Sequence, residues 1–486
     1  MVKVIPRSAR IAGLLLGTAL ITGSILAGGA AAAAVPASQH PAAVSPGRHP
    51  GAVSAGRRPA GMRTLRGHGS PGIFPVPGHA WPGPVPIRPA SGHALVLPAG
   101  VPSPGTSSTL SGIFCPSASN CWAVGSYRSA QLASLDEALH WNGSKWAQVA
   151  VPSPGGTGNG DFSELLSGRC TAPDNCWAVG YYSQAGGAKI DLVLRWNGTK
   201  WSKAAAPSPG GTGTGSVNML SDIACRSSGN CWAAGEYGLD DSGSGIVAIR
   251  NNVLHWNGTK WLQVTVPNPA GTGNLDINQL ASIRCPANND CWAVGLTEIE
   301  TASAVLNEAL HWDGTAWTVA TVPDPGGTAQ DDSNELVNLA CTSSVNCWAG
   351  GVYGTAAGAE TVLNQLLHWD GTAWTQATVP QPGGDSAGDI NVIYSVDCAS
   401  ASDCWAVGEY QDAGATLNQA LRWDGTTWSQ AVTPNPGGTG SGDISELFAV
   451  HCAGATLCWA VGTSGTFSTA ALNEILRWNG STWSAG

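Results

Sequence analysis

The sequence predicts an all-β chain, a seven-bladed β-propeller whose blades are four-stranded antiparallel sheets with one disulfide each. Three observations predict it. A unit of about 55 residues recurs seven times, each unit holds four runs of strand length, and no stretch of residues 101–486 repeats with the period of a helix. Four antiparallel strands repeated radially are the pattern of a β-propeller.

Residues 1–37 have the pattern of an export signal peptide. Lys3, Arg7 and Arg10 precede an apolar stretch, residues 11–29, and small residues suited to cleavage follow it. The alternative is an uncleaved membrane anchor, since the stretch approaches the roughly 20 residues that span a bilayer. We expect cleavage, because Gly and Ala dilute the apolar stretch. The mature protein would then be secreted and have no transmembrane domain. Attachment to the cell surface is left open.

Residues 38–100 form a linker that we expect to be disordered, because it is rich in Pro, Gly, Ala, His and Arg and has no Asp or Glu. Residues 1–100 hold 9 of the 22 Lys and Arg residues. This leaves 13 basic against 32 acidic residues in 101–486, a net charge of −19. The basic arm is either a solvated tether, which we favour, or a contact for an anionic envelope. An acidic repeat domain argues against a nucleic-acid partner.

All 14 cysteines occur as seven Cys-x5-Cys pairs, one in each unit. Export permits disulfides, so we expect seven local bridges. A zinc site is disfavoured, because its four ligands cluster with closer cysteine spacing and no histidine recurs with these pairs. The pairs are Cys115–Cys121, Cys170–Cys176, Cys225–Cys231, Cys285–Cys291, Cys341–Cys347, Cys398–Cys404 and Cys452–Cys458.

The second unit illustrates the four predicted strands, each bounded by Gly, Pro, Asn or Asp. Asn197-Gly198, between the third and fourth strands, is the signal for a type I′ hairpin turn. Four units carry Asn-Gly-Ser/Thr there, which is also a glycosylation sequon. Three carry Asp-Gly, which makes the same turn and accepts no N-glycan, so the turn is what recurs. The predicted strands are 164–170, 176–181, 191–196 and 201–207.

Tryptophan is the second recurrent residue, with 21 of the 22 tryptophans in the repeats, three at fixed positions in each unit. We expect them to fill the wedge between neighbouring blades, where they bury a large apolar area. The alternative is that one of the three sets is exposed and stacks on sugars.

Only one spacing varies among the units. From the Trp after the second Cys to the next Trp the step is 19, 19, 24, 20, 21, 18 and 19 residues, whereas the other steps are constant. In a four-stranded meander this loop shares one face with the loop between blades, here named the variable-loop face. The disulfide and the Asn/Asp-Gly turn lie on the opposite face. Binding sites favour loops on a rigid scaffold, so we expect the site on the variable-loop face.

The last unit ends three residues after Trp483, where the others continue into a Pro-x-Pro tail. That tail occurs at the other end of the domain as 101–105 (VPSPG), preceded by 94–98 (ALVLP). We expect this N-terminal segment to complete the outer strand of the last blade and close the ring.

The loops between blades carry recurrent carboxylates, which predict an acidic funnel at the mouth of the channel. Such a funnel would hold Ca²⁺ or attract a cationic partner. The simpler interpretation, which we favour, is that each Asp caps its own turn, with no metal or other cofactor. The candidate ligand- or cation-binding residues are Asp161, Asp276, Asp332, Asp389, Asp443, Glu164, Glu335 and Glu446.

No residue is singled out as catalytic. Four histidines share one position of the unit with three arginines, which indicates an exposed strand position, and only His451 stands apart. There is no Gly-x-Ser-x-Gly element. Carboxylates suited to glycoside chemistry occur in nearly every unit, so none can be assigned.

The recurring Cys-x5-Cys-Trp-Ala-Val-Gly, Trp-Asn/Asp-Gly-x-x-Trp and Pro-x-Pro-Gly-Gly elements of residues 101–486 resemble secreted bacterial tandem-repeat propeller proteins. More distantly, Trp-Asp-Gly-Thr-x-Trp is similar to the Asp-box turn of sialidase-type propellers, although it lacks the residue between Asp and Gly. No arginine triad of the sialidase kind can be placed, so the resemblance does not imply sialidase activity.

Two functions remain open. The first is an exported non-catalytic recognition or scaffold protein, monomeric, that binds a cell-envelope glycan or an extracellular protein through the variable-loop face. The alternative is a carbohydrate-active hydrolase or lyase that uses carboxylates at the channel mouth.

Overall fold

The computed structural model describes residues 101–238, 248–273, 275–298, 304–354 and 361–486, and every regular element in these ranges is a β-strand. The predicted all-β class is confirmed. The predicted signal peptide, the linker and the 94–98 run lie outside the described residues. In the ranges described, no helix is long and apolar enough to cross a membrane.

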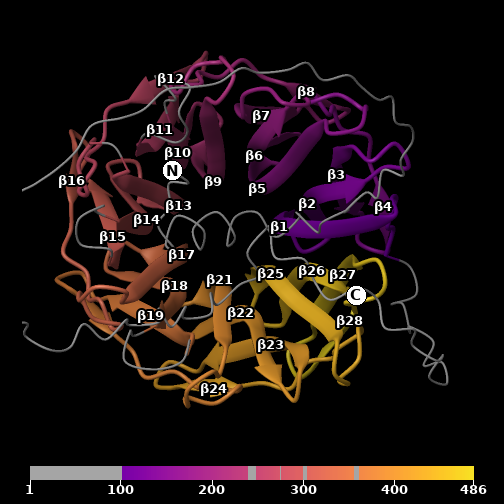
Figure 1. Ribbon diagram of the computed structural model, residues 1–486, viewed down its shortest axis with the longest axis vertical. Coiled ribbons are helices and arrows are strands. Elements are labelled where there is room, and N and C mark those ends of the chain that lie inside the picture. Colours follow the sequence, from indigo (N-terminus) through magenta and orange to yellow (C-terminus); the bar gives the residue numbers. More distant parts are fainter. Residues whose placement is uncertain (1–100, 239–247, 274, 299–303, 355–360) are drawn as a thin grey trace, which may run out of the picture. The chain divides into compact units, whose positions relative to one another are not determined.

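The described strands pair antiparallel in chain order as seven four-stranded units, named here units 1 to 7. Figure 1 shows the first strand of each unit near the centre and the fourth strand at the rim. The first strands are β1 (Ser107–Ser117), β5 (Phe162–Ala172), β9 (Val217–Ser227), β13 (Ile277–Ala287), β17 (Ser333–Ser343), β21 (Asn391–Ser400) and β25 (Asp443–Gly454). The second strands are β2 (Asn120–Arg128), β6 (Asn175–Ser183), β10 (Asn230–Gly238), β14 (Asp290–Glu298), β18 (Asn346–Gly354), β22 (Asp403–Asp412) and β26 (Leu457–Thr466).

The outer two strands of each unit are shorter. The third strands are β3 (Ser134–Trp141), β7 (Ile190–Trp196), β11 (Ile249–Trp256), β15 (Val305–Trp312), β19 (Leu363–Trp369), β23 (Ala415–Trp423) and β27 (Leu472–Trp478). The fourth strands are β4 (Trp146–Gln148), β8 (Trp201–Lys203), β12 (Trp261–Val264), β16 (Trp317–Val319), β20 (Trp374–Gln376), β24 (Trp428–Gln430) and β28 (Trp483–Ala485).

Backbone pairing between units is sparse. Single parallel bridges join the third strand of one unit to the first strand of the next in units 1–2, 3–4 and 6–7, so the strands form four sheets. None of these sheets closes on itself. Consecutive units are therefore held together mainly by side chains.

Tryptophans make most of these contacts, as predicted. Between units 1 and 2, the Trp122 ring lies 4.8 Å from that of Trp196 and 5.2 Å from that of Trp201, centroid to centroid. The same triad recurs at every interface between consecutive units. It also joins unit 7 to unit 1, where Trp459 packs on Trp141 and Trp146.

Each first strand contains a β-bulge at the same place, which in β5 lies between Leu165 and Ser167. The bulge turns the neighbouring side chains toward the centre of the molecule. The second strand approaches closely beside it. A Cβ on Gly180 would lie 1.9 Å from the carbonyl oxygen of Glu164, so the glycine of the Val-Gly element permits this approach.

All seven predicted disulfides form, one in each unit, and no cysteine is free. Each joins the end of the first strand to the start of the second, with Cα atoms 3.9 to 4.0 Å apart. Each unit is thus covalently fixed on the face opposite the variable loops.

The predicted type I′ turn is wrong. Four residues separate Trp141 from Trp146, and of these only Gly143 has a positive φ, 92°. Asn142 instead accepts hydrogen bonds at Oδ1 from the N–H groups of Ser144 and Lys145. Asp313 makes the same contacts, which lower its pKa to about 2, first through the Thr315 hydroxyl and then through backbone N–H groups. Asn and Asp are therefore interchangeable here, as the sequence indicates.

Candidate functional site

The two sets of loops expected on the variable-loop face do meet. The N–H of Ser134 donates to the carbonyl of Asp161 at 3.0 Å, and the N–H of Ala185 donates to Asp161 Oδ1 at 3.1 Å. Between units 6 and 7, Gly442 N donates to the carbonyl of Gly414 at 2.8 Å. Parts of these loops in units 3, 4 and 5 lie outside the described residues.

The five candidate aspartates each bond their own loop. In each, Oδ2 accepts the N–H of the residue three positions earlier at 2.8 Å, as from Gly158 to Asp161 and from Gly440 to Asp443. These are the contacts of turn-capping residues. Within the described ranges, no three His, Cys, Asp or Glu side chains lie together as metal ligands would. The aspartates Asp161, Asp276, Asp332, Asp389 and Asp443 thus each cap a turn of their own loop, and Asp161 also accepts the N–H of Ala185.

Two of the three candidate glutamates, Glu164 and Glu335, are buried, whereas Glu446 in β25 is half-buried. Glu164 in β5 is 2 % exposed and Glu335 in β17 is 1 % exposed. Burial raises the pKa of Glu164 to about 7 and that of Glu335 to about 8. Tyr181 donates its hydroxyl to Glu164 Oε2 at 3.4 Å.

Glu446 belongs to a buried acidic cluster, defined here as Glu335, Tyr394, Glu409 and Glu446, contributed by units 5, 6 and 7. Burial and then the neighbouring Glu446 raise the pKa of Glu409, and burial raises the pKa of Glu446. Tyr394 contacts Glu409, and its pKa is raised by burial and by the surrounding carboxyl groups. The Glu409–Glu446 pair therefore binds protons more readily than isolated carboxyl groups do.

An axial cavity of about 110 Å³ lies between the first strands of all seven units. Its wall is made by the side chains at and just after the β-bulges. One residue from each unit illustrates the lining: Ser111, Ser167, Asp222, Arg284, Asn338, Tyr394 and Phe448. Tyr394 and Glu164 line it toward the variable-loop side, whereas Arg284 directly precedes a disulfide cysteine.

The disulfide side of this cavity holds ionic groups. Asp222 forms an ion pair with Arg284 and accepts hydrogen bonds from Ser167 Oγ and Ser282 Oγ, both at 2.6 Å. Asp397 Oδ2 lies 3.0 Å from His451 Nδ1 and accepts the N–H of Cys452 at 2.8 Å. Burial would raise the pKa of Asp397, but His451 and that N–H outweigh it and the pKa is lowered.

Three of these ionic groups, Arg284, Asp397 and His451, stand at a position of the unit that does not repeat. The residue just before the first cysteine differs in character among the units: Phe114, Arg169, Ala224, Arg284, Ala340, Asp397 and His451. Aligning the seven units on that cysteine would have revealed them. Tyr394 and Glu409 were missed because their proximity depends on the arrangement of units 5, 6 and 7.

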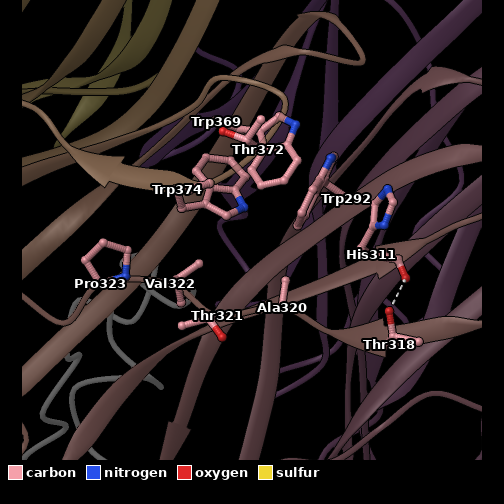
Figure 2. A pocket seen from close by; sticks show the side chains of 11 residues that line it. Trp292, His311, Thr318, Ala320, Thr321, Val322, Pro323, Trp369, Thr372 and Trp374 are labelled. Carbon is pink, nitrogen blue, oxygen red and sulfur yellow. Dashed lines mark hydrogen bonds between the residues drawn. The ribbon is translucent and has the colours of Figure 1, made fainter.

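A shallow groove at the rim, between units 4 and 5, is lined by Trp292, His311, Trp369 and Trp374 (Figure 2). The Trp292 ring packs on His311 at 4.4 Å and on Trp369 at 4.8 Å, and it meets Trp374 edge-on. Trp292 is 2 % exposed and Trp374 is 5 % exposed. The rings of Trp292 and Trp374 are therefore used in packing between units, whereas the ring of Trp369 is half-buried.

No known family model matches the sequence, and no curated protein matches it. Among solved structures, the chain is similar to the fucose-recognising six-bladed β-propeller lectin of Aleuria aurantia, at 14 % identity and a TM-score of 0.36 over 65 % of this chain and 92 % of that one. It is similar to an ulvan lyase at 8 % identity and a TM-score of 0.41, over 66 % and 80 % of the two chains. It is also similar to a xyloglucanase from Xanthomonas campestris, at 13 % identity and a TM-score of 0.29, over 77 % of this chain and 66 % of that one. At these TM-scores, the structural similarities give no information about the site.

Proposed function

We propose that the protein is an exported, non-catalytic recognition protein, a closed seven-bladed β-propeller that binds a glycan through its variable-loop face. The observation that carries the proposal is the buried acidic cluster, whose Tyr394 lines the axial cavity toward its variable-loop side. It lies beneath the loops whose lengths differ among otherwise uniform units.

The chemistry of this cluster suits sugar hydroxyls. Protonated carboxyls and the phenol of Tyr394 each donate and accept hydrogen bonds. Glu335 Oε2 and Glu409 Oε2 are buried and have no hydrogen-bond partner among the described residues. Few, well-placed polar groups in a concave site are what give a small-molecule site its specificity.

The closed propeller is supported by the tryptophan triads, which occur at seven interfaces including that between units 7 and 1. Export is supported by the leader pattern of residues 1–37 and by the seven disulfides. We further propose that the mature protein is monomeric, lies outside the cell and uses the basic segment 38–100 as a tether.

A carbohydrate-active hydrolase or lyase is the second candidate, and the Glu409–Glu446 pair favours it. Two neighbouring carboxyls whose environments push their pKa values apart provide an acid and a base. The pair could then protonate a leaving oxygen and activate water, or abstract a proton from a sugar ring.

A glycan array probed with the full chain tests both candidates, followed by incubation of each bound glycan and analysis for released sugar. We expect binding without release, and an affinity at least about tenfold weaker for Glu446→Gln and Glu409→Gln. Glu137→Gln is the matched control, because Glu137 is buried between units 7 and 1 and units 5 and 6 already have Gln at that position.

Release of sugar that is lost in Glu409→Gln or Glu446→Gln would favour the hydrolase or lyase instead. Absence of binding to every glycan, with binding to an extracellular protein, would overturn glycan recognition.

A further inference from the structure

We propose that the axial cavity receives the acetamido group of an N-acetylated sugar. The methyl of this group packs on Tyr394 and Phe448, and its carbonyl oxygen accepts hydrogen bonds from Ser221 and Asn338. The inference rests on the proposed glycan binding, and it names the kind of sugar that the site selects.

One residue of each unit contributes to a ring around the axial cavity, named here the bulge ring. Each member is the extra residue of the β-bulge in its first strand, and all seven line the cavity. A bulge residue is left out of the strand pairing, so its side chain is free to differ among units that otherwise repeat. The bulge ring consists of Ser111, Leu166, Ser221, Ala281, Val337, Tyr394 and Phe448.

Three consecutive units give the bulge ring an apolar arc, made of Val337, Tyr394 and Phe448. The aromatic rings of Tyr394 and Phe448 meet edge-on, with 5.3 Å between their centroids. Both side chains are half-buried, and both line the cavity. An apolar surface of this kind stabilises a C–H group of a ligand, because the contact removes both from water.

Hydrogen-bond donors without an acceptor line the same cavity. Ser221 is 5 % exposed, and its Oγ has no hydrogen-bond partner among the described residues. Asn338 Oδ1 accepts the N–H of Val396 at 3.0 Å, whereas its Nδ2 donates to no group in the described ranges. Ser395 Oγ accepts the N–H of Val450 at 3.2 Å, which leaves the hydroxyl hydrogen to donate. A buried polar group without a partner is costly, so these groups favour a ligand oxygen.

The charges of the cavity wall favour a neutral ligand group. Glu164 and Asp222 line the cavity together with one arginine, Arg284. Asp222 already pairs with Arg284 and accepts hydrogen bonds from Ser167 and Ser282. The arginine is therefore engaged, and a bound carboxylate would face two further carboxyl groups. A neutral carbonyl oxygen can accept from the free donors without this repulsion.

Volume limits what the cavity encloses. It measures about 110 Å³, less than the roughly 150 Å³ of an engineered protein cavity that encloses benzene. The cavity therefore holds a substituent of a sugar rather than the whole pyranose ring. An acetamido group has a methyl for the apolar arc, a carbonyl oxygen for the free donors and an N–H for Glu164. A hydroxyl or a free amine has neither the methyl nor the carbonyl.

The test is a titration of the full chain with methyl N-acetylglucosaminide, followed by calorimetry and by saturation-transfer NMR. Methyl glucoside, which has a hydroxyl in place of the acetamido group, is the control ligand. We expect saturable binding of methyl N-acetylglucosaminide, at least about tenfold tighter than that of methyl glucoside. Irradiation of the aromatic protons of the protein should give its strongest response at the acetamido methyl, because this group contacts Tyr394 and Phe448.

Two substitutions in the bulge ring probe the cavity itself. Ala281→Leu should fill the cavity and weaken binding at least about tenfold. Unit 2 already has Leu166 at that position, so the fold accepts the larger side chain. Ser221→Ala removes the unpaired hydroxyl and should weaken binding about five- to tenfold without lowering the melting temperature. Ser484→Ala is the matched control, since Ser484 is exposed in β28, and it should bind as the unchanged protein does.

Equal affinities for methyl N-acetylglucosaminide and methyl glucoside, or undiminished binding by Ala281→Leu, would overturn the acetamido site and leave glycan recognition in place. Binding of no sugar at all would contradict both proposals. Tighter binding of Nε-acetyl-lysine than of the sugar would assign the acetamido group to a protein ligand and would also overturn the inference. A lower melting temperature of Ser221→Ala with unchanged affinity would show that this hydroxyl is structural and does not contact the ligand.

Discussion

Polar side chains pair across the interfaces between units, beside the tryptophans. Asn251 of unit 3 donates to Glu308 of unit 4, and Asn418 of unit 6 donates to Glu474 of unit 7. Six interfaces contain such a pair: Asn473–Glu137, Asp191–Asn252, Asn251–Glu308, Asn307–Gln365, Asn364–Gln419 and Asn418–Glu474. Each satisfies two buried polar groups at once.

The interface between units 1 and 2 lacks this pair. Asp136 is 3 % exposed, and neither of its carboxyl oxygens has a partner in the described residues. Leu192 occupies the position of the usual partner. Burial and the nearby Glu164 raise the pKa of Asp136. This is a local weakness in an otherwise regular interface.

Asp136→Asn should raise the free energy of unfolding at pH 7 by about 1 kcal/mol. The new amide would donate to the carbonyl of Pro152, as Asn251 donates to that of Pro267 at 2.9 Å. The substitution would also remove the unpaired buried carboxyl of residue 136. Denaturant unfolding measures the change. The reverse substitution Asn251→Asp is the control and should destabilise by about 2 kcal/mol. Equal stability of Asp136→Asn and the unchanged protein would contradict the account.

At the scale of elements, the last unit is completed by both ends of the described domain. Gly486 N donates to the carbonyl of Ile475 at 2.9 Å, the bond that Val149 makes to Ala138 in unit 1. Asn473 then donates to the carbonyl of Pro102 at 2.8 Å, as Asn418 does to that of Pro434. The outer edge of unit 7 therefore joins the C-terminus to the segment beginning at Val101.

Deleting residues 1–104 should lower the free energy of unfolding by about 2 to 4 kcal/mol relative to deleting residues 1–90. The longer deletion removes the partly buried Val101 and leaves Asn473 without one of its acceptors. Thermal and denaturant unfolding compare the two proteins. Coincident unfolding curves would show that 91–104 does not close the ring.

The predicted strands of unit 2 match the observed ones except for the last. The run 201–207 was expected as one strand, but β8 ends at Lys203, one residue before Ala204 makes a final bond to Val193. Prolines lack an N–H and cannot continue the pairing, so the Pro-x-Pro tail turns away. Hydropathy indicates that a run is buried, and proline position decides how far it pairs.

At the scale of the whole molecule, buried carboxyls determine the response to pH. Burial raises the pKa of Glu137 and Glu335 to about 8 and that of Glu164 and Glu236 to about 7, from about 4.5. The folded state keeps these protons over a pH range in which the unfolded state has lost them. Their contribution to stability is complete below pH 4.5 and is lost as pH rises through 7 to 8.

The free energy of unfolding should therefore be at least about 2 kcal/mol lower at pH 8 than at pH 5. His140, His255 and His368, whose pKa is lowered by burial, act in the opposite sense below pH 6.5, but from partly exposed rings. Denaturant unfolding across this range measures the slope, and Glu137→Gln should reduce it. Stability that increases from pH 5 to pH 8 would refute the assignment of protonated carboxyls.

The sequence by itself determined the all-β class, the seven repeated units, their disulfides and the role of tryptophan. These features are local or periodic, so spacing along the chain expresses them directly. It also identified Glu164, Glu335 and Glu446, but as members of a solvated ring with the loop aspartates.

Tertiary structure alone decided what those residues contact. The aspartates bond within their own loops, because the nearest donors are three residues away. Glu164 and Glu335 are buried, Glu446 lies beside Tyr394 and Glu409, and Glu164 and Tyr394 line the axial cavity. This proximity brings together side chains from different units, and burial then determines whether the carboxyl groups are charged. Neither the proximity nor the charge can be predicted from the spacing within one repeat.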